Sequence, residues 1–349
     1  MAVAGRKVCK APGRLCAGGF LSRTGLTWGG PEGRLEMGSR AWKCLLIASI
    51  LATLLCAACS SKAEEKAQPK AFNSQVAFDV YAVVGDGRQV VGSTPSERPL
   101  TIPPCQWWYV EPGRPVDMEK VGQEVEVQGI PGLKLRNATD AELGHLKGLT
   151  ALQRLILTDA QITDGGLEYL NGLTALQDLT LSGTKVTDAG LQHLKGLTGL
   201  RELSLWNMKV TDAGLEHLKG LTGLHSLDLW NAGVTDAGLV HLQGLTGLHY
   251  LGLMGTKVTG AGLKHLKRLT VLQELNLEGT QVTGAGLEYL KGLRRLQWLW
   301  LKDTQVTDAG LEHLKALTQL RYLDLRGTQV TEAGVEQLKK SLPNVAVVR

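Results

Sequence analysis

The sequence lacks the features that would place it among nucleic-acid-binding proteins or enzymes. Its 38 basic and 33 acidic residues leave a net charge of only +5, and it contains no long run of lysine or arginine. Binding to nucleic acid requires a basic patch, so we do not expect that partner. The GxSxG elbow, the glycine-rich phosphate loop and the HExxH motif are also absent. We therefore expect a protein that is not an enzyme, needs no cofactor and has no small-molecule substrate.

Long apolar runs are lacking as well, because the run at residues 44–55 is too short to span a bilayer comfortably. It follows a basic segment at residues 40–43 and precedes small residues, the order found in export signals. The sequence LCAAC at residues 55–59 resembles the lipobox of bacterial lipoproteins, although Cys56 stands where leucine or valine is usual. The resemblance implies lipid on Cys59 and a membrane contact through it. An ordinary signal peptide cut nearby and an uncleaved anchor are the alternatives.

Cysteine is scarce after this segment. Of the six cysteines, four precede the expected cleavage site and Cys59 would carry lipid, which leaves Cys105 alone. A single thiol excludes an intrachain disulfide framework in the mature protein. The sequence also has no zinc-ligand spacing, so we expect no metal site.

The front of the chain differs in composition from the rest. Residues 1–58 form the signal region, and because a signal normally begins near the initiator, we expect translation to start at Met37. Residues 59–71 are small and polar and predict a tether.

Residues 72–128 predict a small β-rich unit or cap. They contain the alternating apolar stretches VAFDVYAVV and EVEVQGI, separated by glycine and proline turns. Trp107, Trp108 and Tyr109 are expected in the core of this unit or over the first repeat. Such a cap is needed because the end of a repeat array exposes apolar surface.

Residues 129–349 form a repeat array. Glycine is frequent, at 43 residues against 11 prolines, which indicates regularly spaced turns. Threonine recurs every 24 residues, at Thr139, Thr163, Thr187, Thr211, Thr235, Thr259, Thr283, Thr307 and Thr331. Eight full units therefore fill residues 139–330, and a ninth, partial unit ends the chain, where Val345 and Val347 are expected in a closing strand.

Each unit combines a short helix with a strand. In TDAGLQHLKGLTGLRELSLWNMKV, residues 187–210, the first leucines recur about once per turn and predict a helix. The second half has the pattern L-x-x-L-x-L of a strand, with Leu203 and Leu205 facing inward. This unit resembles the leucine-rich-repeat family, in the phase of ribonuclease-inhibitor-like and F-box leucine-rich proteins and of planctomycete repeat proteins. The resemblance implies an α/β solenoid.

Stacking these units predicts the shape of the array. A single unit cannot bury its apolar face, so stacked units share one core beneath a parallel sheet. Because helices are wider than strands, the sheet should curve with its strands on the concave side and its short helices on the convex side.

Recurrent polar positions have local roles. Threonine suits a helix N-cap, and the acidic residue that usually follows it interacts favourably with the positive end of the helix dipole. The turn after each strand holds only residues that tolerate positive φ, namely Asp159, Gly183, Asn207, Asn231, Gly255, Gly279, Asp303 and Gly327. The threonines that follow in five units are expected to bond loop backbone groups: Thr184, Thr256, Thr280, Thr304 and Thr328.

Histidine recurs at one helix position, at His145, His193, His217, His241, His265 and His313. Stacked imidazoles could bind a metal, but tyrosine or glutamine fills the position in other units and no carboxylate or cysteine shares a ligand geometry. In a helix, His193 lies about 200° from Leu191 and faces away from the core. We expect a surface column.

The outward positions of the strands vary most between units, and all four tryptophans of the array occupy them. They form two expected aromatic patches: Trp206, Trp230, Tyr250 and Met254 in the middle, and Trp298, Trp300 and Tyr322 towards the C-terminus. Exposed aromatic clusters usually mark binding surfaces. Alternatively, the rings lie over the strands or pack against a neighbouring loop.

These features predict a non-catalytic protein of the bacterial cell envelope, exported and lipid-anchored on the periplasmic or surface face. Its concave face would bind a protein or peptide. One alternative is an F-box-type adaptor for ubiquitin transfer, against which the export signal argues. Another is a carbohydrate-binding or cell-wall structural module, because aromatic rows can stack on sugars.

Overall fold

The computed structural model describes residues 69–84 and 87–349, which all belong to one compact unit. The signal region and Cys59 lie outside the described residues, so the lipidation of Cys59 remains a prediction. None of the described helices is both long enough and apolar enough to cross a membrane.

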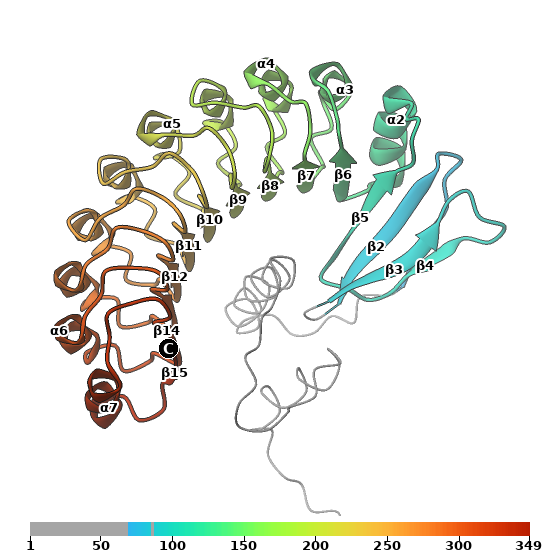
Figure 1. Cartoon of the computed structure of the whole chain (residues 1–349). Helices are drawn as coiled ribbons and strands as arrows, with labels where there is room; N and C mark the ends of the chain where they lie inside the picture. Colours follow the sequence, from blue (N-terminus) through green and yellow to red (C-terminus); the bar gives the residue numbers. More distant parts are fainter. Residues whose placement is uncertain (1–68, 85–86) are drawn as a thin grey trace, which may run out of the picture. The chain divides into compact units, whose positions relative to one another are not determined.

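A sheet of 13 strands runs through this unit and lines the inner side of its arc (Figure 1). Ten consecutive strands pair in parallel, which confirms the predicted strand of every repeat. They are β6 (Gly132–Arg136), β7 (Arg154–Thr158), β8 (Asp178–Thr180), β9 (Glu202–Ser204), β10 (Ser226–Asp228), β11 (Tyr250–Gly252), β12 (Glu274–Asn276), β13 (Trp298–Trp300), β14 (Tyr322–Asp324) and β15 (Ala346–Val348). The predicted closing strand contains Val347 but begins after Val345.

The N-terminal strands continue this sheet. β5 (Trp107–Pro112) pairs in parallel with β6 and antiparallel with β2 (Phe78–Val84), which in turn pairs with β3 (Gly87–Ser93). β1 (Lys70–Phe72) and β4 (Leu100–Ile102) form a separate antiparallel pair. The side chains of Phe72, Phe78 and Trp108 are buried with the leucine core, so the core of the array extends under this segment.

One expectation for this segment is wrong, because EVEVQGI is not a strand. It lies mostly in helix α2 (Met118–Gln128), in which Met118, Val121 and Val125 form the buried stripe. These buried residues are spaced by three and four, as on one face of a helix, and this spacing outweighs the strand-like alternation of EVEVQGI. Val127 is left 81% exposed. Gly129, in the left-handed conformation, ends the helix.

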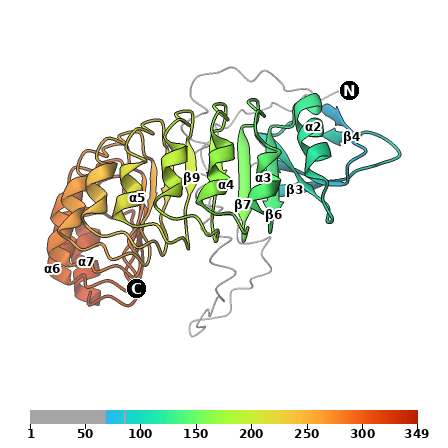
Figure 2. The ribbon, with the colours of Figure 1, turned by 90° about the horizontal axis from the view of Figure 1, so that it is seen from above.

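Short helices cover the outer side of the arc, as predicted (Figures 1 and 2). Several are 3-10 helices, labelled η, because the 24-residue unit leaves room for little more than one turn. They are α3 (Asp140–Gly144), α4 (Asp164–Leu167), η1 (Glu168–Leu170), η2 (Gly190–Leu194), α5 (Asp212–Glu216), η3 (Gly238–Leu242), η4 (Gly262–Leu266), η5 (Gly284–Leu290), α6 (Asp308–Leu311), η6 (Glu312–Leu314) and α7 (Glu332–Ser341).

The aspartate that follows six of the nine threonines joins neighbouring repeats, a role that the helix-dipole interpretation missed. Asp188 accepts hydrogen bonds from the backbone N–H of Thr211 at 2.7 Å and from its hydroxyl at 2.5 Å. The same pair of bonds links Asp140 to Thr163, Asp164 to Thr187, Asp212 to Thr235, Asp236 to Thr259 and Asp308 to Thr331. The recurrent threonine therefore has two roles. Its hydroxyl accepts a hydrogen bond from a first-turn N–H in five units, as predicted for an N-cap, and the residue also bonds the aspartate of the preceding repeat.

The turn residues after each strand, and the threonines that follow them, largely adopt the predicted roles. All eight predicted turn residues have positive φ, including Asn207 at 56° and Asn231 at 54°. The hydroxyls of Thr256, Thr280, Thr304 and Thr328 each donate to the carbonyl of the leucine three residues earlier. Thr184 is the exception, since its buried hydroxyl has no hydrogen-bond partner among the described residues.

Candidate ligand-binding site on the concave face

A cavity of about 370 Å³ opens on the N-terminal half of the concave face. Its lining comes from β2, β3 and the consecutive strands β5 to β10. Aromatic rings, charged groups and short polar side chains converge there, including Trp107, Tyr109, Trp206, Arg88, Lys134, Arg154, Asp178, Glu202, Asp228, Thr180, Ser204 and Ser226. A concave site with aromatic walls and a few placed charges is the usual form of a ligand pocket.

Strand β5 supplies the aromatic wall. Its alternation buries Trp108 and Val110 in the core and puts Trp107 on the opposite, concave side. The Arg154 guanidinium lies 3.5 Å from the centre of the Trp107 ring, a cation–π contact that holds both side chains. Tyr109 stacks on Trp107 with ring centres 5.4 Å apart, and its hydroxyl accepts a hydrogen bond from Arg88 at 3.1 Å.

At the basic end of the cavity, Lys134 and Arg136 share one carboxylate. Lys134, which is only 8% exposed, bonds Glu111 at 3.0 Å, and Arg136 forms a second ion pair with the same carboxylate. Burial alone would raise the pKa of Glu111, but the hydrogen bonds from Arg136 and Lys134 outweigh it and lower that pKa. Lys134 therefore has a permanent counter-ion.

The opposite side of the cavity carries three carboxylates. Asp178 and Glu202 share Arg154, which forms a close ion pair with Asp178 and a longer contact of 3.9 Å with Glu202. Burial, together with the neighbouring Glu202, raises the pKa of Asp178 above the usual range. Burial also raises the pKa of Asp228 to about 6, against the effect of a hydrogen bond from the Trp230 N–H.

The central aromatic patch is smaller than predicted. Trp206 and Trp230 are half-buried and stack with ring centres 5.6 Å apart, and Met254 is half-buried nearby on the next repeat. The prediction that Tyr250 belongs to this exposed patch is wrong, because its side chain is buried at 3% exposure. A Cβ built on Gly252 would lie 2.7 Å from the Tyr250 hydroxyl, so the absent side chain of Gly252 lets the ring lie along strand β11. Of the seven predicted residues, Trp206 alone lines the cavity.

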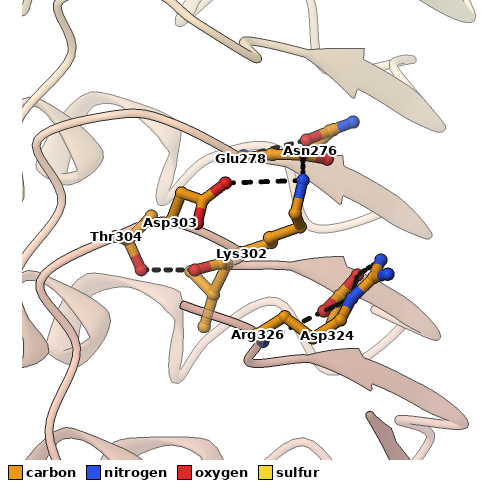
Figure 3. A network of polar contacts seen from close by, with 8 residues as sticks. Asn276, Glu278, Lys302, Asp303, Thr304, Asp324 and Arg326 are labelled. Carbon is orange, nitrogen blue, oxygen red and sulfur yellow. Dashed lines mark hydrogen bonds and ion pairs between the residues drawn. The ribbon is translucent and has the colours of Figure 1, made fainter. Parts of the chain in front are cut away.

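The C-terminal aromatic patch is interleaved with charge. Trp298, Trp300 and Tyr322 are half-buried, and the rings of Trp300 and Tyr322 lie 6.0 Å apart. Beside them, Lys302 contacts Glu278 at 2.5 Å and Asp303 at 3.4 Å, and Arg326 bonds Asp324 (Figure 3). Burial would lower the pKa of Lys302, but its hydrogen bond to Glu278 raises it. Ion pairs therefore lie beside the predicted aromatic residues of this patch.

Several cavity residues were not singled out from the sequence. Trp107 was expected in the core of its unit or over the first repeat. The sequence pattern places Arg154, Asp178, Glu202 and Asp228 at variable outward positions of the strands, without marking them as site residues. The sequence pattern that could have identified Trp107 is the alternation of β5, which puts Trp107 and Trp108 on opposite faces of the sheet. The missing information was that β5 pairs with β6 and so brings Trp107 beside Arg154.

The histidine column lies on the convex side, where its members are half-buried or exposed. Within residues 69–84 and 87–349, no group of three histidine, cysteine, aspartate or glutamate side chains is placed to hold a metal ion. Cys105 is a free, partly buried thiol whose pKa burial raises.

Comparison with known proteins agrees with this fold. Residues 148–170 and 268–291 match the family model for the Leucine Rich repeat. An internalin from Listeria monocytogenes is similar in structure, with 24% identity over 66% of this chain and 70% of that chain and a TM-score of 0.52. A leucine-rich-repeat protein from Leptospira interrogans has 19% identity, coverage of 66% and 68%, and a TM-score of 0.49. No curated protein sequence matches the chain significantly.

The fold is thus a leucine-rich-repeat solenoid, with a parallel sheet inside and short helices outside. Its N-terminal strands extend the same sheet and complete one wall of the concave cavity.

Proposed function

We propose that this chain is a non-catalytic binding protein whose concave face holds a peptide or an extended segment of a protein. The observation that carries the proposal is the cavity over β5 to β10, in which Trp107, Tyr109 and Trp206 surround fixed charged groups. Aromatic side chains beside arginine are typical of the residues that dominate binding energy in protein interfaces. We further propose that lipid on Cys59 anchors the chain at the bacterial cell envelope. Mass spectrometry of the mature N-terminus tests this, because an unmodified Cys59 or an intact Met1 would refute it.

Binding through the concave face predicts opposite outcomes for two aromatic substitutions. Peptides selected from a random display library on the purified chain should bind the Trp107→Ala variant at least ten-fold more weakly, because a central aromatic contact contributes about 2 kcal/mol or more. The Tyr289→Ala variant should bind them normally, since Tyr289 is 39% exposed on the convex η5. Titration calorimetry measures both affinities, and circular dichroism checks that both variants are folded. Selection of no peptide, or equal loss in the two variants, would refute the proposal.

A further inference from the structure

One buried carboxylate of the cavity, Asp228, lacks the counter-ion that the equivalent carboxylate of Asp324 has. Asp228 occupies the same strand position as Asn276 in β12 and Asp324 in β14. Each accepts a hydrogen bond from the backbone N–H two residues later, at 3.2, 2.9 and 3.1 Å respectively. Asn276 carries no charge, and the Arg326 guanidinium bonds Asp324 at 2.5 Å. Among the described residues, Asp228 has no lysine, arginine or histidine nitrogen within 4.0 Å.

Asp228 and a neighbouring hydroxyl are buried without the partners that their charge and polarity require. Its side chain is only 8% exposed, and a buried charge without a counter-ion is unfavourable unless something else provides one. The Tyr250 hydroxyl is also buried and has no hydrogen-bond partner in the described part of the chain. A Cβ on Gly252 would lie 2.5 Å from Asp228 Oδ1 and 2.7 Å from the Tyr250 hydroxyl. The Asp228 carboxylate and the Tyr250 hydroxyl therefore both lie in the space that a side chain at position 252 would take.

The lining of the cavity balances three cations against three carboxylates, and the carboxylates lie on the same side as Asp228. The lining contributed by β7 to β10 holds one cation, Arg154, against the three carboxylates of Asp178, Glu202 and Asp228. Lys134, at the other end, already has Glu111 as its counter-ion. The Trp206 ring also lines this region, and an indole face attracts a cation. Carboxylates beside an indole are the environment that a guanidinium or ammonium group favours.

We propose that this cavity receives the cationic side chain of a peptide ligand, with its guanidinium or ammonium group held between Asp228 and Glu202. The inference rests on the proposed function, because it names the chemistry by which the concave face recognises its peptide. The ligand cation would supply the counter-ion that Asp228 lacks, while Arg154 remains with Asp178 and the ring of Trp107.

Two probes that differ in charge and little in shape test this. We expect N-acetyl-arginine methylamide to bind the full chain saturably in an NMR titration, and the citrulline analogue, which is neutral, to bind at least ten-fold more weakly. Asp228→Asn should weaken binding of the arginine probe at least ten-fold. Glu216→Gln, on the exposed convex face of α5, should not change it. A thermal melt of each variant confirms that loss of binding is not loss of fold.

Equal binding of the two probes, absence of arginine binding, or an unchanged affinity in Asp228→Asn would overturn the inference. These outcomes differ from failure of the proposed function. Display-selected peptides without a basic residue that still require Trp107 would leave concave-face binding intact while removing the cationic subsite.

Discussion

Substitution of Gly214 by alanine should lower the free energy of unfolding by about 1–3 kcal/mol, the usual cost of overpacking a tight site. Gly214 is buried in α5, and a Cβ there would lie 2.3 Å from Asp188 Oδ1. That oxygen accepts the N–H of Thr211, so the methyl group must displace the carboxylate that joins the two repeats. Because the contact lies between units, stacking itself would be weakened. Urea unfolding followed by circular dichroism measures the change.

Gly220→Ala is the matched control for this substitution. A Cβ on Gly220 has no atom within 4 Å, and Gly220 is not among the described residues with positive φ. Alanine there should be neutral or stabilise the chain by about 0.4–1 kcal/mol through the unfolded state. If Gly214→Ala is as well tolerated as Gly220→Ala, the glycine is not required for the Asp188–Thr211 contact.

Substitution of Asp228 by asparagine should stabilise the chain at neutral pH. Burial raises the pKa of Asp228 in the folded chain to about 6, from an ordinary value of about 3.9 in an unfolded chain. The folded state then binds the proton more tightly, so stability falls as pH rises from about 4 to about 6 and stays low above that. Asparagine cannot ionise, so the gain should approach about 3 kcal/mol at pH 8 and vanish near pH 4.

Asp324→Asn should have the opposite sign at pH 8. Asp324 is fully buried and makes the same backbone hydrogen bond, but it also binds the Arg326 guanidinium. Loss of hydrogen bonds to a charged partner costs about 1.5–3 kcal/mol. Thermal unfolding of both variants at pH 4 and pH 8 makes the comparison. Destabilisation by Asp228→Asn at pH 8 would mean that the buried charge is compensated in the folded chain.

The periodicity of the sequence was sufficient to predict the solenoid, because each leucine position is set by the same local spacing in every unit. It also predicted which residues adopt positive φ, since only glycine, asparagine and aspartate occupy those turns. Contacts between repeats were harder to foresee. Asp188 bonds Thr211, 23 residues away, and the spacing within one unit favours a role in its own helix. The helical stripe of α2 was missed because its valines also alternate.

The site was predicted less completely than the fold. A strand pattern identifies which side chains face the concave surface, but not how a ring lies on it. Trp206 and Trp230 stack as neighbours, whereas Tyr250 lies down beside Gly252 and is buried. Trp107 belongs to a strand whose place in the sheet depends on tertiary pairing with β6. The convergence of Trp107, Arg154 and Glu202 could be found only from that pairing.

Cross-linking tests the binding of peptides to the concave face most directly. A display-selected peptide carrying a photoreactive diazirine would be irradiated with the full chain, and the modified residues identified by mass spectrometry. We predict modification on strands β5 to β10, around Trp107, Ile156 and Trp206, and loss of this modification when unlabelled peptide competes. Modification confined to the convex helices α3 to α7 would contradict it.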